Sequence, residues 1–345
     1  MQPGNTTAKT ILNNQQHNNY FMKQRIFILL TAIALGVTTF SGKPGGSPNP
    51  DPSVTTVSIS FSGAFALYPL VQTWAAEYNK THPDIRFDIQ AGGAGKGLTD
   101  CLAGAVDVGM FSRELTDAEK AKGVWTLALC RDAVLPTYNA KNANAKSIQI
   151  RGVKRAEFNS IFADHTITTW EQLLGTTSKS PHKINVYTRA DAAGAADSWA
   201  AFFGKKQENL KGLGVSGDPG VADAVRKDLN AIGYNNTLFV YDPKTGKKLP
   251  GIDVVPIDVN GNGTIDPDEN FYDNLRIFLK AVNDGKYPSP PARNLYFITK
   301  GKTNNKDILD FFKWVLTDGQ QFVSVAGYVA LPKGTVQDQI KKLGK

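Results

Sequence analysis

The chain has 345 residues, of which 41% are hydrophobic and 20% are charged. This length exceeds what one compact core organises, and this composition excludes a chain that is disordered throughout. The formal net charge of +8 suits an anionic partner, but no run of Lys and Arg is longer than two residues, which argues against a basic stripe for nucleic acid. We expect a soluble two-domain monomer that binds a small anion and no nucleic acid.

The first 42 residues are expected to hold an N-terminal extension and an export signal that starts at Met22. A polar stretch over residues 1–20 precedes Lys23 and Arg25, which are followed by an apolar run over residues 26–40. This run of about 15 residues is shorter than the roughly 20 that a membrane-spanning helix needs, which favours a cleaved signal peptide over a transmembrane anchor. No Cys ends the run, so we expect a soluble periplasmic protein without a lipid anchor. Residues 43–54, rich in Gly, Pro and Ser, are interpreted as a linker.

Two cysteines, Cys101 and Cys130, remain after the signal. An oxidising compartment would permit a disulfide between them, closing a loop of 28 residues. Two buried thiols are the alternative, because sequence does not give the separation of the two side chains. Both readings stay open at this point.

The first half of the chain alternates between strands and helices. Alternating apolar residues predict strands over 57–61 and 85–90, and each is followed by a small-residue turn and a helix, over 69–80 and 98–103. A third strand is expected over residues 105–111. This succession indicates a parallel sheet that binds ligands at the carboxyl ends of its strands.

The second half predicts another lobe of the same kind. A strand over 125–138 leads into a polar crossing at 139–146, and the Pro-rich residues 287–292 are expected to return the chain. We therefore expect an α/β fold of two lobes that hinge around a cleft. Lobe 1 is placed at residues 55–140 and 292–345, and lobe 2 at 141–291. The elements expected in lobe 2 are a helix over 154–162, a strand over 183–188, a helix over 194–203 and a strand over 231–234.

Three turns between a strand and a helix offer anion-binding groups. Turns at 63–66, 92–97 and 192–195 place small residues between a strand and a helix, and a helix N-terminus there presents unpaired N–H groups and a positive dipole end. Arg189 and Arg113 could add planar forks of donors. The alternatives are tight packing for the turns, a solvated surface charge for Arg113, and an ion pair for Arg189. The candidate ligand-binding residues are Gly63, Ala64, Ala66, Gly93, Ala94, Gly95, Ser112, Arg113, Arg189, Asp191, Ala193, Gly194 and Ala195.

Several motifs in this order resemble the phosphate-binding proteins of the phosphate ABC importers. They span residues 57–331 and comprise AGGAGKG at 91–97, VDVGMFSREL at 106–115, IF at 161–162, TITTW at 166–170, RADAAGA at 189–195, AIGY at 231–234, YP at 287–288 and AGYVAL at 326–331. The resemblance implies a two-lobed receptor of the type II periplasmic-binding-protein (Venus flytrap) fold. It also implies that the receptor closes on phosphate and delivers it to a membrane permease.

The chain differs from this family at the positions that hold the anion. The family holds phosphate with side-chain hydroxyls, and the matching positions here are Ala66, Ala94, Ala193 and Ala195. Each lost bond to a charged oxyanion costs roughly 1.5 to 3 kcal/mol. A well-studied branch places a proton-accepting Asp where this chain has Arg113, whereas its Arg-x-Asp is matched by residues 189–191. Phosphate remains the first expectation, with sulfate, tungstate or a larger anionic solute as the alternative.

A second motif predicts a structural calcium site. Residues 258–269 match the twelve-residue loop of the EF-hand, with Gly263 at the sharp turn. An Asx-rich turn without metal is the alternative. A predicted strand over 251–257 stands where a sensor would have a helix, which favours a structural role. The expected Ca²⁺ ligands are Asp258, Asn260, Asn262, Thr264, Asp266 and Glu269.

Two other classes of function are rivals. His82, His165 and His182 have no metal-ligand spacing, and no serine stands in a nucleophile elbow, so a phosphatase-like enzyme lacks visible catalytic groups. A calcium-dependent interaction module would carry paired short loops, whereas this chain has one such loop inside a long domain. We therefore expect a binding protein rather than an enzyme.

Overall fold

The computed structural model of the protein describes residues 56–344. The predicted signal peptide (1–42) and linker (43–54) lie outside this part, so both remain predictions. Within it, no helix is long and apolar enough to span a membrane. The main sheet has the strand order β2 (Ile85–Ala91), β1 (Val57–Gly63), β3 (Val108–Phe111), β11 (Ala292–Lys300), β4 (Val124–Asn139), β8 (Ala231–Asn236), β6 (Asn185–Arg189) and β7 (Leu213–Val215).

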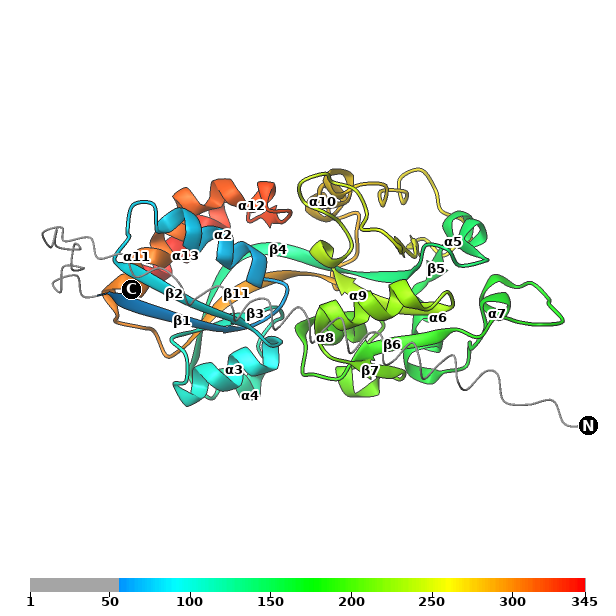
Figure 1. Cartoon of the computed structure of the whole chain (residues 1–345), viewed down its shortest axis with the longest axis horizontal. Helices are drawn as coiled ribbons and strands as arrows, with labels where there is room; N and C mark the ends of the chain where they lie inside the picture. The colour runs from blue at the N-terminus through cyan, green and yellow to red at the C-terminus, as the bar shows by residue number, and fades with distance from the viewer. Residues whose placement is uncertain (1–55, 345) are drawn as a thin grey trace, which may run out of the picture. The chain divides into compact units, whose positions relative to one another are not determined.

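The first lobe contains the predicted βα units. Strand β1 (Val57–Gly63) pairs in parallel with β2 (Ile85–Ala91) and β3 (Val108–Phe111). Helix α2 (Tyr68–Tyr78) buries Leu70, Val71, Trp74, Ala75 and Tyr78 against the sheet, because these residues recur at the helical period. All three parallel strands therefore end on the same edge, as Figure 1 shows.

Helix α3 (Ala94–Ala103) begins four residues before the predicted start at residue 98. The small residues that were expected to form a turn instead form its first helical turn. Gly97 explains the close packing there: a Cβ at this position would lie 2.7 Å from the Ser62 carbonyl oxygen. The glycines thus bring the N-terminus of α3 close to the end of β1.

The two lobes are joined by strands that belong to both. Strand β4 (Val124–Asn139) pairs with β11 (Ala292–Lys300) along its first part and with β8 (Ala231–Asn236) along its second. Up to Cys130 its buried side chains lie in the core of lobe 1, and from Ala133 they lie in the core of lobe 2. The first crossing is therefore inside this strand and not in the polar segment 139–146, so the predicted boundary at residue 140 comes too late. The return crossing lies at the start of β11, close to the prediction.

Lobe 2 repeats the parallel arrangement. Strand β6 (Asn185–Arg189) pairs in parallel with β7 (Leu213–Val215) and β8, and the helices α8 (Gly194–Phe202) and α9 (Gly217–Lys227) follow β6 and β7. The remaining elements are α4 (Asp117–Lys120), α5 (Ala145–Arg151), β5 (Val153–Lys154), α6 (Arg155–Asn159), η1 (Ser160–Asp164), α7 (Trp170–Leu174), η2 (Gln207–Asn209), η3 (Thr237–Phe239), β9 (Ile252–Val254), β10 (Ile257–Asp258), α10 (Leu275–Asn283), α11 (Lys306–Leu316), η4 (Asp318–Gln320), α12 (Gln321–Val325), β12 (Val329–Ala330) and α13 (Lys333–Gly344).

Both cysteines are buried free thiols. The Cys101 thiol donates a hydrogen bond to the Ile298 carbonyl oxygen at 3.5 Å. Burial raises the pKa of Cys101, and it raises that of Cys130 well above its usual value. Of the two alternatives, the structure has the buried thiols and not the disulfide.

Candidate anion-binding site

The three predicted turns meet in one small hollow between the lobes. About 150 Å³ of its space is free of protein atoms, and part of that space is open to solvent. We call it the anion hollow. Its lining residues are Ala64, Phe65, Ala66, Gly93, Ala94, Ser112, Arg189, Ala193, Gly194, Ala195, Asp218 and Asn236. Nine of the thirteen candidate residues are among them.

Two helices point their N-termini into this hollow. Neither α3, whose N-cap is Gly93, nor α8, whose N-cap is Ala193, has a side-chain cap hydrogen bond. The first N–H groups of a helix have no partner within the helix, so an uncapped end offers them to a ligand. The lining residues contribute a single side-chain hydroxyl, that of Ser112, which is only 2% exposed. Apart from the Gly95 N–H, which bonds to the Ala192 carbonyl oxygen, the first backbone N–H groups of both helices are therefore the main candidate donors at this site.

Arg189 lies at the end of β6 and is held by two carboxylates. Its Nε is 2.8 Å from Asp191 Oδ1, its Nη2 also contacts Asp191, and its Nη1 is 2.5 Å from Asp218 Oδ2. Although burial alone would raise the pKa of Asp191, the hydrogen bond and charge of Arg189 lower it below the usual value. Asp191 does not line the anion hollow, and it acts here as the partner of Arg189. The ion pair that is the alternative to direct binding by Arg189 is therefore present.

Asp218 is the functional candidate that the sequence analysis missed. Its side chain is almost fully buried, and its Oδ1 also accepts a hydrogen bond from the Asn236 N–H at 3.2 Å. It belongs to the first turn of α9, and Gly217 before it has the left-handed φ of 70°. Residues 216–220, the N-cap and first turn of α9, therefore form a fourth small-residue junction between a strand and a helix, which the same pattern could have identified.

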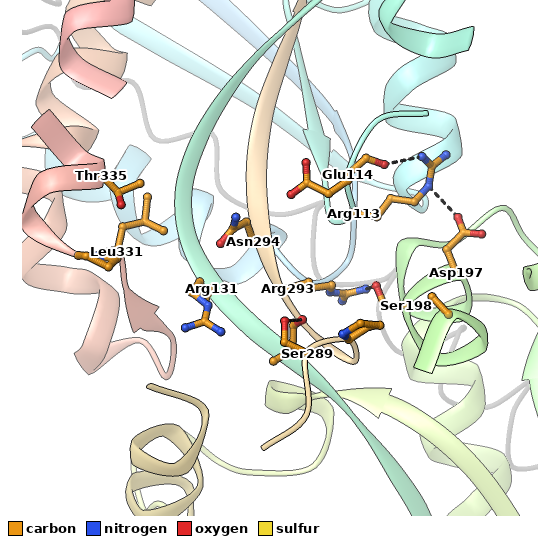
Figure 2. A pocket seen from close by; sticks show the side chains of 14 residues that line it. Arg113, Glu114, Arg131, Asp197, Ser198, Ser289, Arg293, Asn294, Leu331 and Thr335 are labelled. Atoms are coloured by element: carbon orange, nitrogen blue, oxygen red, sulfur yellow. Dashed lines mark hydrogen bonds and ion pairs between the residues drawn. The ribbon is translucent and has the colours of Figure 1, made fainter. Parts of the chain in front are cut away.

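Arg113 does not line the anion hollow, which corrects the prediction that it binds the ligand. Its guanidinium turns away and lies between Glu119 and Asp197. Figure 2 shows its bond to Asp197. It lines a second hollow, the hinge hollow, together with Arg131 and Arg293 on the crossing strands. The alternative of a solvated surface charge does not hold either, since its side chain is only 19% exposed.

The remaining glycine candidates have packing roles. A Cβ at Gly63 would lie 2.2 Å from the Met110 carbonyl oxygen, so this glycine allows β1 to approach β3. Gly95 touches the opposite lobe: its N–H donates to the Ala192 carbonyl oxygen at 3.0 Å. A Cβ at Gly95 would lie 2.5 Å from the Ala192 Cβ. Gly63 and Gly95 thus shape the closed cleft without lining the anion hollow.

The predicted calcium loop turns its carboxylates inward. Asp258 and Glu269 are buried, and Asp258 accepts hydrogen bonds from the N–H groups of Gly261 at 2.7 Å and Gly263 at 2.8 Å. Asp266 Oδ2 accepts from the side-chain amides of Asn260 and Asn262, at 2.8 and 2.9 Å. In residues 56–344, however, no group of three or more His, Cys, Asp or Glu side chains is arranged to hold a metal ion. The calcium site stays a prediction.

Fold and site define a two-lobed α/β binding protein with an anion hollow in its cleft. A family profile described as the PBP superfamily domain matches residues 48–319. The chain therefore belongs to the PBP superfamily.

Individual relatives agree with this assignment. The chain is 25% identical to the phosphate-binding protein PstS of Xylella fastidiosa, over 87% of this chain and 89% of that protein. It is 26% identical to PstS of Methanocaldococcus jannaschii, over 89% and 91% of the two chains.

Solved structures share the fold. One is a phosphate ABC transporter substrate-binding protein from Clostridium perfringens with bound phosphate, with a TM-score of 0.64 and 22% identity, covering 80% of this chain and all of that one. Another is an ABC-type phosphate transport receptor from Vibrio cholerae, with a TM-score of 0.57 and 18% identity, covering 79% and all of the two chains.

Proposed function

We propose that this protein is an exported receptor that binds phosphate in the anion hollow and delivers it to an ABC permease. The observation that carries the proposal is the hollow itself, which combines uncapped helix N-termini with a buried arginine. Such N–H groups and a positive dipole end favour an oxyanion. The names of the relatives, phosphate-binding proteins from a bacterium and an archaeon, support the same ligand.

Asp218 supports phosphate over sulfate. Sulfate is an alternative ligand because Arg113, at the position of the family's proton-accepting Asp, cannot accept a proton. Arg113 is outside the hollow, however, and the Asp218 carboxylate lines it. A carboxylate accepts a hydrogen bond from the hydroxyl of hydrogen phosphate and repels sulfate, which has no proton to donate. The lining therefore offers both the donors and the acceptor that a protonated oxyanion requires.

Calorimetric titration with phosphate, sulfate, molybdate and tungstate tests this function. We expect phosphate to bind at least tenfold more tightly than sulfate. Asp218→Asn should reduce that ratio at least tenfold, because its amide donates where the carboxylate accepted. Asp223→Asn, an exposed carboxylate on the same helix, is the matched control and should keep the ratio. A wild-type protein that binds none of the four anions would contradict the proposed function.

The proposal includes export and excludes catalysis. Mass spectrometry of the protein recovered from the periplasm should show a mature N-terminus just after the apolar run at residues 26–40. An intact N-terminus would contradict cleavage. Purified protein should release no phosphate from phosphate monoesters, since the residues that line the anion hollow include no His or Cys and only one hydroxyl.

We also propose that the loop at residues 258–269 binds Ca²⁺ as a structural ion. Its donor set of carboxylates, amides and a backbone carbonyl consists of hard oxygens of the kind that Ca²⁺ prefers. Calcium at about a hundred times its Kd should stabilise the fold by roughly 2.7 kcal/mol. The melting temperature should rise in calcium, and Glu269→Gln should abolish that rise. Asp268→Asn, at an exposed position of the same loop that supplies no ligand, should keep it. Equal wild-type melting temperatures in calcium and in chelator would refute the site.

A further inference from the structure

Arg113 connects the two lobes through its side chain. Its Nη1 and Nη2 each lie 2.8 Å from one oxygen of Glu119, and its Nε lies 2.7 Å from Asp197 Oδ2. Glu119 belongs to α4 in lobe 1, whereas Asp197 belongs to the first turn of α8 in lobe 2. Figure 2 shows the guanidinium of Arg113 with its bond to Asp197 across the hinge hollow. One side chain thus bonds to both lobes at once.

The lobe 1 end of this connection is held by several contacts within lobe 1. Glu119 Oε2 also accepts a hydrogen bond from the Thr116 N–H at 2.8 Å, as part of a capping box that fixes α4. The guanidinium lies over the Phe111 ring, with its carbon 4.7 Å from the ring centroid. Contacts within lobe 1 therefore hold Arg113 in place. Asp197 makes or breaks its ion pair with Arg113 when the lobes close or open.

We infer that Arg113, Glu119 and Asp197 form an interlobe clasp that holds the cleft closed and so sets the affinity of the anion hollow. This inference rests on the proposed function for its ligand. The apparent Kd of a receptor equals its intrinsic Kd divided by the fraction in the binding-competent state. A contact made only between closed lobes raises that fraction without touching the anion. Arg113 and Asp197 are thus positioning residues.

The charges around Asp197 predict the order in which substitutions act. Asp197→Asn removes one bond and leaves Arg113 paired with Glu119. Arg113→Ala instead leaves two partly buried carboxylates facing each other across the lobes, and unpaired like charges repel. Arg113→Ala should therefore favour the open form more strongly than Asp197→Asn.

The sign of one effect separates the clasp from direct binding. If Arg113 or its charge acted on the anion directly, Asp197→Asn would remove a competing negative charge and tighten phosphate binding. The clasp requires the opposite, because the closed fraction falls. We expect Asp197→Asn to weaken phosphate binding three- to tenfold and Arg113→Ala to weaken it more than tenfold. Asp223→Asn, an exposed carboxylate elsewhere in lobe 2, should change it less than twofold.

The distance between the lobes is the second measurement. Nitroxide labels at Lys122→Cys in lobe 1 and Lys211→Cys in lobe 2, both exposed positions, report it by pulsed electron resonance. The native thiols are buried and should not be labelled. Without phosphate, Asp197→Asn should shift the distances toward longer values than those of the unsubstituted labelled protein, and phosphate should shift them back.

These two measurements separate the clasp from the proposed function. A protein that binds no phosphate but still opens on Asp197→Asn would retain the clasp and lose the proposed function. Unchanged distances in Asp197→Asn would overturn the clasp. Phosphate binding that becomes tighter in this variant would also overturn it and return Arg113 to the role of a direct ligand.

Discussion

Substituting Gly95 by Ala tests whether tight closure of the lobes determines affinity. A Cβ at this position would lie 2.5 Å from the Ala192 Cβ and 3.1 Å from the Ala192 carbonyl oxygen. Carbon atoms pack best at about 3.5 to 4.0 Å, so the lobes would have to separate locally by about 1 to 1.5 Å. This movement would also break the hydrogen bond from the Gly95 N–H to Ala192, which is 3.0 Å long.

The expected loss of affinity follows from these distances. Overpacking of this kind costs about 1 to 3 kcal/mol, which corresponds to phosphate binding that is about 5- to 150-fold weaker. The fold of lobe 1 should not suffer, because Gly95 lies in helix α3 with no left-handed φ. Replacing Gly by Ala in a helix stabilises it by roughly 0.5 to 1 kcal/mol. The ligand-free melting temperature should therefore stay the same or rise while the affinity falls.

Calorimetry with phosphate and a melting curve for each variant measure both effects. Gly334→Ala, where a Cβ would meet nothing within 4 Å, is the control and should bind like the wild type. Adding Ala192→Gly to Gly95→Ala removes the closest contact and should restore most of the affinity. Wild-type affinity in Gly95→Ala would refute the argument, as would a double variant that binds no better than the single one.

Three further outcomes are expected. Arg189→Ala should weaken phosphate binding more than tenfold in calorimetry and reduce stability to denaturant by about 3 to 5 kcal/mol, because Asp191 and Asp218 lose their shared partner; unchanged affinity would exclude Arg189 from the site. Ala195→Ser should tighten binding by about tenfold or more by adding a donor to the anion hollow, and no gain in a titration would show that backbone N–H groups suffice. The hydrogen bonds to Arg113 lower the pKa of Glu119 from 4.5 to about 2, so its contribution of about 3 kcal/mol is present above pH 4.5 and is lost as the pH falls toward 2. Glu119→Gln should remove that part of the acid sensitivity, and identical acid unfolding of both proteins would contradict it.

The local features of this fold were predictable from the sequence. The period of apolar residues located β1, α2, β2 and α8 to within a few residues, because each of these elements buries one face. The small-residue turns were predictable for the same reason, since a strand-to-helix turn is a local pattern. They brought nine candidate residues to one hollow.

The long-range features were not predictable in this way. Strand β4 is buried along most of its length, first in the core of lobe 1 and then in the core of lobe 2. Its sequence is therefore apolar on both sides of the crossing and does not indicate where the crossing lies. The direction of Arg113 depends on Asp197, which is distant in the sequence and lies on the other lobe. Asp218, by contrast, belongs to a local small-residue pattern at residues 216–220, and it was missed because a single acidic residue beside a proline is also typical of an ordinary turn.

The interleaving of the lobes has a consequence for the order in which the protein folds. The core of lobe 2 draws almost entirely on one continuous stretch, residues 133–292, whereas the core of lobe 1 needs strands from both sides of that stretch. During synthesis, which starts at the N-terminus, lobe 2 can be completed before β11 is available to pair with the first strands of lobe 1. Strand β1 and its neighbours then expose a sheet edge that could pair with another chain. A pause before residue 292 is the interval in which this protein should depend most on a chaperone.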